Sequence, residues 1–161
     1  MGVKEDLGFQ ILDLLKAHEF KLAELYTVFA EKDAANKKFW ERMSREEVGH
    51  AGMLDRLRKD IASGKNRFLT WCQDRPQIIR ETATLEQSIA EARTRRTMPA
   101  AETLGRALVL ERSIVEHRFY DVVEDDCDTV THFKVTMAMS LDKHIEGLRK
   151  LVDGVGKTGG G

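Results

Sequence analysis

The feature that most constrains this chain is an apolar stripe, with steps of three and four residues, that two polar residues interrupt. Between residues 39 and 61 the stripe consists of Trp40, Met43, Glu47, His50, Leu54, Leu57 and Ile61. Such steps place side chains on one face of an α-helix, which predicts a helix that packs in a bundle. Glu47 and His50 are three residues apart on that face, so both side chains could bind one metal ion from the bundle interior.

Three further stripes of the same kind predict three more helices. A helix over about residues 5 to 31 carries Leu12, Leu15, Glu19, Leu22, Tyr26 and Phe29. A helix that begins near Pro99 carries Leu104, Leu108, Glu111, Val115 and Val122. The last helix carries Val130, Phe133, Met137, Leu141, His144, Leu148 and Leu151. Each stripe again contains one polar residue among apolar ones: Glu19, Glu111 and His144 respectively.

The polar residues of the four stripes are expected to meet at one level of the bundle. A short turn around residues 31 to 35 makes the first two helices antiparallel neighbours, and Glu19 and the Glu47/His50 pair lie at similar distances from it. The last two helices repeat this arrangement with Glu111 and His144 about a turn near residue 126. The spacing F-x3-M-x6-H-x3-L also occurs twice, from residue 39 and from residue 133, which indicates two similar hairpins.

The long segment between the hairpins, residues 64 to 98, is expected to cross from one end of the bundle to the other. Thr84-x-x-Gln87 has the form of a capping box and predicts a short extra helix over about residues 85 to 95. The fold class is therefore all-α: an antiparallel four-helix bundle of two hairpins, joined by a long crossover with a short extra helix. We expect one domain, residues 1 to 153, followed by a disordered Gly-rich tail over residues 154 to 161.

Composition argues against several classes of partner. The net charge is −1 with both signs interspersed, which offers no field for nucleic acid or for an anionic membrane. No apolar run approaches the roughly 18 residues of a membrane span, and the first ten residues lack the pattern of a signal peptide. Cys72 and Cys127 form no CxxC motif, which argues against a thiolate metal site and favours a reducing, cytoplasmic location.

Three carboxylates at one depth of an apolar core require positive charge nearby, because burying an ionised carboxylate alone costs several kcal/mol. No Lys or Arg lies on the stripes at that level, and Arg118 is two turns from Glu111. Iron or manganese with carboxylate and imidazole ligands fits this set better than zinc or calcium. Each residue alone also has an ordinary interpretation, since a single inward Glu can set helix register and a single inward His can be hydrogen-bonded core.

Other polar and apolar residues lie around these stripes. Tyr26 is two turns from Glu19, where its hydroxyl could reach a partner of the metal ligands. The remaining histidines, His18, His117 and His132, fall off the stripes and are expected at the surface. The first helix has a second apolar arc of Leu14, Leu25 and Val28, which could cover the connector or form the interface of a homodimer.

Four stretches of the sequence resemble the ferritin-like superfamily, and within it the rubrerythrin-type proteins, over about residues 8 to 62 and 100 to 152. They are HEFKLAELYTVFAEKD, SREEVGHAGML, LVLERSIVEHRFYDVVED and MAMSLDKHIEGL. The resemblance implies that the metal ligands are Glu19, Glu47, His50, Glu111 and His144. It also places a Tyr, here Tyr26, seven residues after the first ligand Glu. One position departs from the family pattern, since Leu141 stands where the family would carry Glu.

This resemblance implies a cofactor of one or two non-haem iron ions, or manganese, and an oxidoreductase of the peroxidase or ferroxidase type. Peroxide or dioxygen would be the substrate, and the chain lacks the rubredoxin segment that supplies electrons in full-length rubrerythrins. An external electron-donor protein would then be the partner. The alternative is a degenerate bundle that serves as a binding or assembly module with at most one structural metal, because Leu141 removes one ligand charge.

Overall fold

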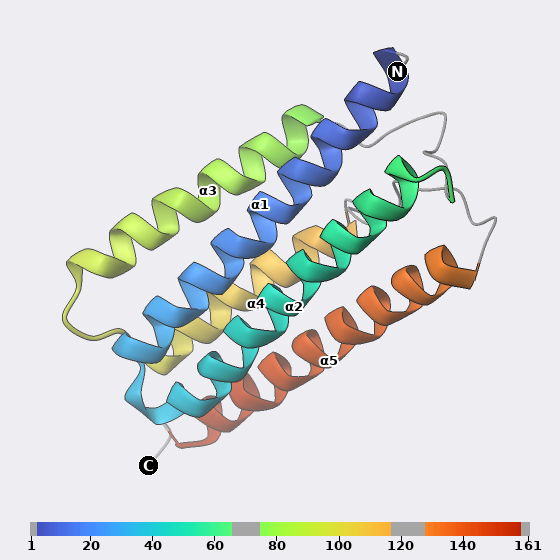
Figure 1. Ribbon diagram of the computed structural model, residues 1–161. Coiled ribbons are helices and arrows are strands. Elements are labelled where there is room, and N and C mark those ends of the chain that lie inside the picture. Colours follow the sequence, from blue (N-terminus) through green and yellow to red (C-terminus); the bar gives the residue numbers. More distant parts are fainter. Residues whose placement is uncertain (1–2, 66–74, 117–127, 159–161) are drawn as a thin grey trace.

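The computed structural model describes residues 3–65, 75–116 and 128–158, and in these ranges the chain is helical without strands. The helices are α1 (Val3–Lys32), α2 (Lys37–Ala62), α3 (Arg75–Thr94), α4 (Ala100–Glu116) and α5 (Asp128–Thr158), with a 3-10 turn, η1 (Ala34–Asn36), between α1 and α2. Figure 1 shows the helices arranged side by side as a bundle. The predicted all-α class is confirmed.

The α1–α2 pair forms an antiparallel unit, as its short turn predicted. Ser44 Oγ donates to the carbonyl of Ala23 at 2.9 Å near the turn, and Lys16 pairs with Asp55 at 2.8 Å two to three helical turns further along. Beyond α2, Gly64 adopts φ of 77° and its N–H donates to the carbonyl of Ile61 at 2.9 Å. A left-handed residue is suited to glycine, which explains why α2 ends here.

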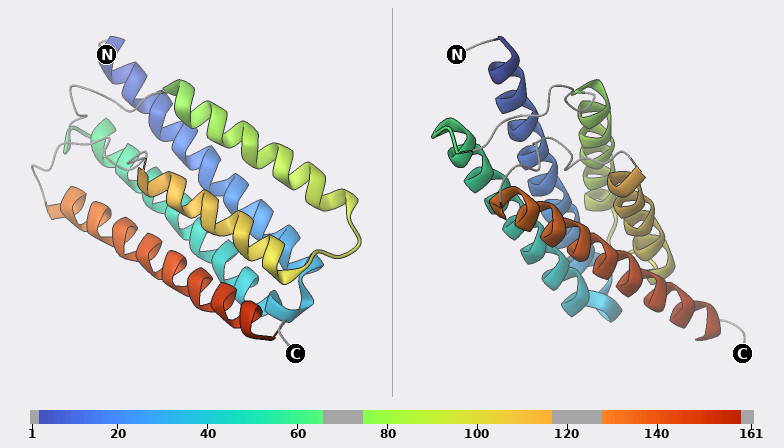
Figure 2. Two further views of the ribbon diagram at one scale, coloured as in Figure 1. Left: turned by 180° about the vertical axis from the view of Figure 1, so that it is seen from behind. Right: turned by 90° about the vertical axis from the view of Figure 1, so that its right-hand side faces the viewer.

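Helix α4 is antiparallel to α1, as two side-chain contacts show. Thr103 at the start of α4 donates to Asp33 Oδ2 at the end of α1, and Tyr26 further back on α1 donates to Glu111 further along α4. Helix α5 packs on α4 and also runs antiparallel to α2, where His50 lies next to Ser140. Figure 2 shows from two sides that α1, α2, α4 and α5 surround a common interior.

The connector differs from its prediction in the length of its helix. Helix α3 begins at Arg75 and not near Leu85, so it has 20 residues. Thr84 lies within the helix, where its hydroxyl donates to the carbonyl of Arg80 at 3.0 Å, and it does not cap the helix. The apolar spacing of Ile78, Leu85, Ile89 and Ala92, all buried, explains the longer helix. Pro76 falls in the first turn, where proline is tolerated.

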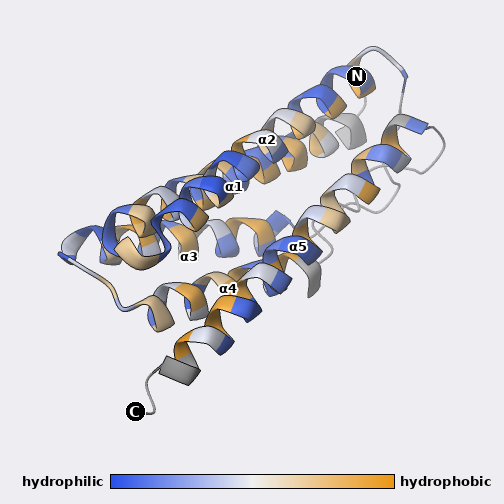
Figure 3. Cartoon of the chain, turned by 90° about the horizontal axis from the view of Figure 1, so that it is seen from below, coloured by the Kyte–Doolittle hydropathy of each residue, from blue (hydrophilic) through white to orange (hydrophobic). Residues whose placement is uncertain are grey.

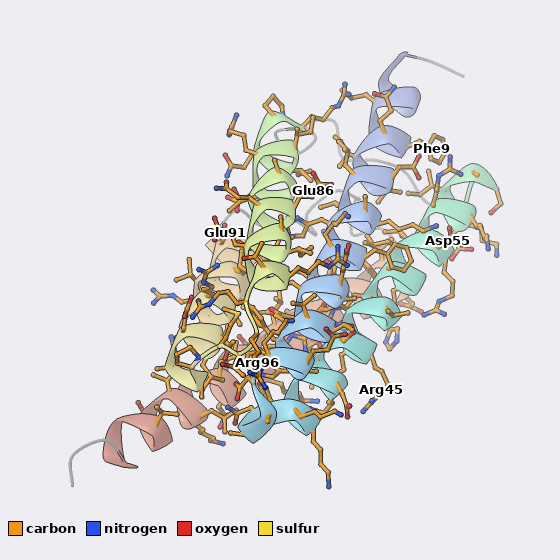
Figure 4. All side chains as sticks on the ribbon, turned by 90° about the vertical axis from the view of Figure 1, so that its left-hand side faces the viewer. Phe9, Arg45, Asp55, Glu86, Glu91 and Arg96 are labelled. Atoms are coloured by element: carbon orange, nitrogen blue, oxygen red, sulfur yellow. The ribbon has the colours of Figure 1, made fainter. Side chains whose placement is uncertain are left out.

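Helix α3 crosses the length of the bundle as a partner of α1. His18 on α1 contacts Thr82, and Glu24 on α1 contacts Arg93, so the two helices run parallel. Figure 4 shows Glu86 on the α3 surface beside α1, where its carboxylate lies 3.8 Å from Lys21 Nζ. The expected crossover is therefore present, and it covers the second apolar arc of α1, in which Leu25 and Val28 are buried.

One apolar core runs through the bundle. Figure 3 shows hydrophobic and hydrophilic faces alternating around the helices. The largest fully buried side chains include Trp40, Tyr26 and Phe29, whose rings contact one another. At the C-terminus, α5 continues to Thr158, so residues 154 to 158 of the predicted tail are helical, while residues 159–161 lie outside the described part of the chain. None of the described helices has the length and apolar character that crossing a membrane requires.

Candidate metal centre

The structure brings the five predicted ligand residues together in the middle of the bundle. We call these residues the central cluster: Glu19 on α1, Glu47 and His50 on α2, Glu111 on α4 and His144 on α5. All five are buried, with 6% of the residue surface exposed or less. They lie at one level because the short α1–α2 turn and the α4–α5 packing align the helices as the stripes predicted.

Glu47 occupies the centre of the cluster. Its Oε2 lies 2.6 Å from Nδ1 of His50, and its Oε1 lies 3.2 Å from Nδ1 of His144. The centroids of the two imidazole rings are 5.7 Å apart. One carboxylate thus directs its two oxygens toward two different histidines.

The other two carboxylates each approach one histidine. Glu19 Oε2 lies 3.5 Å from His50 Nδ1, and Glu111 Oε2 lies 3.4 Å from His144 Nδ1. The cluster therefore divides into two groups, Glu19–Glu47–His50 and Glu47–Glu111–His144. Within each group the three ligand atoms lie within 4.8 Å of one another, close enough to bind a single ion. Glu47 belongs to both groups.

Electrostatics show what balances these carboxylates in the metal-free chain. Burial lowers the pKa of His50, but hydrogen bonds and charge from Glu19 and Glu47 outweigh it and raise the pKa to about 10. Burial likewise lowers the pKa of His144, but hydrogen bonds and charge from Glu111 and Glu47 outweigh this effect and raise the pKa to about 11. The two histidines thus supply the cations that Lys and Arg do not, which sequence reasoning had overlooked.

Tyr26 contacts the cluster as the sequence suggested. Its hydroxyl donates to Glu111 Oε1 at 2.5 Å, which leaves Oε2 of Glu111 directed toward His144. Burial, together with the charge of Glu111, raises the pKa of Tyr26 well above its ordinary value, so the hydroxyl keeps its proton. Burial also raises the pKa of Glu19. The phenol therefore acts as a hydrogen-bond donor that fixes the orientation of Glu111.

Two residues that contact the outer ring nitrogens, Nε2, of His50 and His144 were not identified from the sequence. His144 Nε2 lies 2.6 Å from Glu46 Oε2, and His50 Nε2 lies 2.9 Å from Ser140 Oγ. Both partners precede a cluster histidine by four residues: Glu46 precedes His50 and Ser140 precedes His144. Each contacts the histidine of the opposite helix, because α2 and α5 are antiparallel. This equal spacing of four residues in the sequence could have predicted both Glu46 and Ser140 as partners of the histidines.

Leu141 is buried, with 6% exposed, one turn before His144 on the same face of α5. Neither of the two groups contains a carboxylate from α5. The cluster as described offers three buried carboxylates and two imidazoles. Such a set of carboxylate oxygens and imidazole nitrogens could hold a metal ion.

One buried oxygen of Glu47 is a second observation that fits a bound metal. Glu47 Oε1 is buried and accepts no hydrogen bond within the described residues, although His144 is nearby. A buried carboxylate oxygen without a hydrogen bond is costly unless a cation satisfies it. In the metal-free chain the charge of protonated His144, 3.2 Å away, compensates this oxygen without a hydrogen bond, and an ion held by Glu47, Glu111 and His144 would take over that role.

His18 was expected at the surface and is buried, with 2% exposed. It lies between α1 and α3, where its Nδ1 is 3.1 Å from Thr82 Oγ1. Thr82 in turn donates to the carbonyl of Ile78, so its hydroxyl can accept from His18. Burial lowers the pKa of His18. The prediction failed because α3 covers a second face of α1; His132 is exposed as expected, and His117 lies outside the described residues.

A separate buried carboxylate lies at the α1–α2 turn and was also missed. Asp33, 3% exposed, accepts hydrogen bonds from Asn36 Nδ2 at 2.9 Å, Trp40 Nε1 at 3.0 Å and Thr103 Oγ1 at 2.9 Å. Burial alone would raise the pKa of Asp33, but these hydrogen bonds outweigh it and the pKa is lowered. We call Asp33, Asn36, Trp40 and Thr103 the turn cluster.

Comparison of the chain with protein-family models, with curated proteins and with solved structures found no match.

Proposed function

We propose that the chain is a ferritin-like, rubrerythrin-type non-haem iron protein whose central cluster holds up to two metal ions. The observation that carries the proposal is the position of Glu47, whose two oxygens face the two histidines and which is common to both three-residue groups. A carboxylate shared in this way supports two adjacent ion positions, one with Glu19 and His50 and one with Glu111 and His144.

The proposed activity is oxidation of the bound iron by peroxide or dioxygen, with electrons returned by a separate donor protein. When bound, iron would supply the electrons for reduction of the oxidant. The chain itself supplies binding and orientation. Glu47 would contribute one oxygen to each position, and Tyr26 donates to Glu111 Oε1 so that Oε2 stays directed toward His144. The buried apolar residues around the cluster exclude water.

A second candidate function has its own supporting observation. Leu141 leaves the cluster one carboxylate short of the family pattern, and protonated His50 and His144 can neutralise the remaining carboxylates in the absence of metal. A bundle of this kind could serve as a binding or assembly module with at most one structural metal.

Metal content separates the two functions. The protein is made without a chelating tag, iron and manganese per chain are measured, and ferrous iron is then added without oxygen before peroxide or dioxygen. We expect up to two irons per chain and consumption of the oxidant faster than by free iron. Glu47→Gln should abolish both. The control Glu41→Gln, on the same helix, loses a salt bridge with Lys37 at 3.9 Å, the one that Glu41 makes within the described residues, and should change neither. Bound metal without oxidant consumption would favour the second function, and absence of bound metal would reject the first.

A further inference from the structure

The two histidines of the central cluster have unlike partners on their outer nitrogens. His144 Nε2 lies 2.6 Å from a carboxylate oxygen of Glu46, whereas His50 Nε2 lies 2.9 Å from the hydroxyl of Ser140. Both contacts cross the space between α2 and α5. The chain therefore places a charged acceptor behind one imidazole and a neutral group behind the other.

The two groups are otherwise closely matched. Each has one imidazole, one carboxylate of its own, and a share of Glu47. Tyr26 also donates to Glu111, but a neutral phenol changes the donor strength of that carboxylate less than a full negative charge behind His144 changes the imidazole. Glu47 lies 2.6 Å from His50 Nδ1 and 3.2 Å from His144 Nδ1, so the partner of the outer nitrogen is the main difference in charge between the groups.

Glu46 is suited to act through His144. Its side chain is 40% exposed, so keeping it charged needs little compensation, and its other oxygen lies 3.7 Å from Arg42 Nε. A carboxylate that accepts from the outer nitrogen fixes the orientation of an imidazole and increases the basicity of the inner nitrogen toward a metal. A hydroxyl fixes orientation but adds no charge.

We propose that the two ion positions are unequal, and that the Glu47–Glu111–His144 position binds a divalent ion more tightly than the Glu19–Glu47–His50 position. Glu46 is the positioning residue that sets this order, by acting on His144. The inference rests on the proposed function, since it requires the central cluster to bind metal. Outer partners of metal-bound histidines commonly change affinity by about 10- to 100-fold, which is the difference expected between the positions.

The test is calorimetric titration of Mn²⁺ into the chain of residues 1 to 161 without oxygen, repeated with Co²⁺ so that its visible absorption reports each binding event. The parent should show a tight and a weak event. His144→Ala should remove the tight event, and His50→Ala should remove the weak one.

Two variants then test Glu46 itself. Glu46→Gln should weaken the tight event by about 10- to 100-fold and alter its Co²⁺ absorption, while the weak event changes little. Ser140→Glu, which places a carboxylate behind His50, should strengthen the weak event. Glu41→Gln is the matched control on α2 and should leave both events unchanged. Circular dichroism confirms that each variant is folded.

Each outcome has a defined meaning. Two events of equal affinity that do not respond to Glu46→Gln overturn this inference and leave the proposed function intact. Loss of the tight event in His50→Ala, with the weak one retained, also overturns it. A parent chain that binds neither Mn²⁺ nor Co²⁺ rejects the proposed function, and the present inference with it. A gain at the weak position in Ser140→Glu supports it even where Glu46→Gln is too unstable to measure.

Discussion

The central cluster and the turn cluster both bury carboxylates, but they satisfy them in opposite ways. Asp33 in the turn cluster accepts hydrogen bonds from an amide, an indole and a hydroxyl, all neutral donors on α2, α4 and the turn between α1 and α2. The carboxylates of the central cluster face one another and two histidines, and Glu47 Oε1 has no hydrogen bond within the described residues. The structural carboxylate is already satisfied by neutral donors, whereas the groups of the central cluster could hold an added cation.

Removal of Asp33 should give the largest loss of stability. Asp33→Ala leaves Trp40 Nε1 without its acceptor and removes the hydrogen bonds from Asn36 and Thr103, of which Thr103 keeps only the carbonyl of Ala100. The unfolding free energy should fall by about 4 kcal/mol. The loss should be the same with and without iron, because the turn cluster lies apart from the metal. Urea unfolding in both conditions checks this, with Asp153→Ala on the exposed face of α5 as the control. A loss that iron restores would contradict the separation of the two clusters.

Leu141→Glu should convert the central cluster into the complete set of the family pattern. Without metal, replacing a buried leucine by a carboxylate should cost about 3 kcal/mol, since apolar burial is lost and like charges approach. With iron, the variant should bind up to two ions and recover the loss, giving a larger metal-dependent rise in melting temperature than the parent shows.

Leu141→Gln is the matched control, because it has similar size and polarity but no charge. It should be destabilised without recovering on addition of iron. Should Leu141→Glu bind no more iron than the parent, the register assigned to α5 by the repeat of the two hairpins is wrong.

Glu47→Gln should have a small effect on the metal-free protein. It removes one of three buried carboxylates and keeps the shape of the side chain, while Glu19 and Glu111 remain as partners of protonated His50 and His144. The unfolding free energy should therefore change by less than about 1 kcal/mol or increase. The metal-dependent rise in melting temperature should disappear, which distinguishes Glu47 from Asp33. Thermal unfolding with and without iron measures both quantities, and Glu41→Gln is the control. If Glu47→Gln strongly destabilised the metal-free protein and did not reduce metal binding, Glu47 would have a structural role like that of Asp33.

The two clusters should also respond to pH in opposite directions. The pKa values of His50 and His144, about 10 and about 11, lie above the ordinary value of 6.5, so the stability they contribute is present below pH 6.5. That stability is lost as pH rises toward 10 and 11. The lowered pKa of Asp33 contributes stability that is present above pH 3.8 and is lost as pH falls below it.

Urea unfolding of the metal-free protein at pH 5, 7 and 9 tests the alkaline part of this prediction. The parent should lose stability from pH 7 to 9, and a His50→Gln, His144→Gln double variant should not. Metal binding displaces the protons on Nδ1, so the affinity for iron should increase over the same range. Stability that is constant from pH 7 to 9 would contradict the assignment of the histidines as the metal-free cations.

Most of the bundle and all five central residues could be predicted because each lies on a regular stripe of one helix. Periodicity alone places Glu47 and His50 on an inward face, and the lengths of the turns set their level. The features that could not be predicted depend on contacts between helices that are distant in sequence. His18 is buried because α3 lies against a second face of α1, and Asp33 is satisfied by donors on α2 and α4.

Helix α3 and the outer partners of the histidines illustrate two further limits. The capping-box motif at Thr84 predicts a helix start that the structure does not show, because the apolar pattern continues through buried Ile78 toward Arg75. Glu46 lies at the side of α2, where a charged residue is ordinarily solvated, and its contact with His144 depends on the position of α5. The apolar periodicity of α2 alone carries no information about which residues of α5 lie beside it.

The most direct test of the central claim is anaerobic titration of the parent protein with ferrous iron, followed by measurement of bound iron per chain and of the melting temperature. A cluster arranged around Glu47 for an added cation predicts saturable binding of up to two ions and a melting temperature that rises with free iron. No bound iron together with an unchanged melting temperature would contradict the claim. The central cluster would then be a second structural cluster, neutralised by its own histidines.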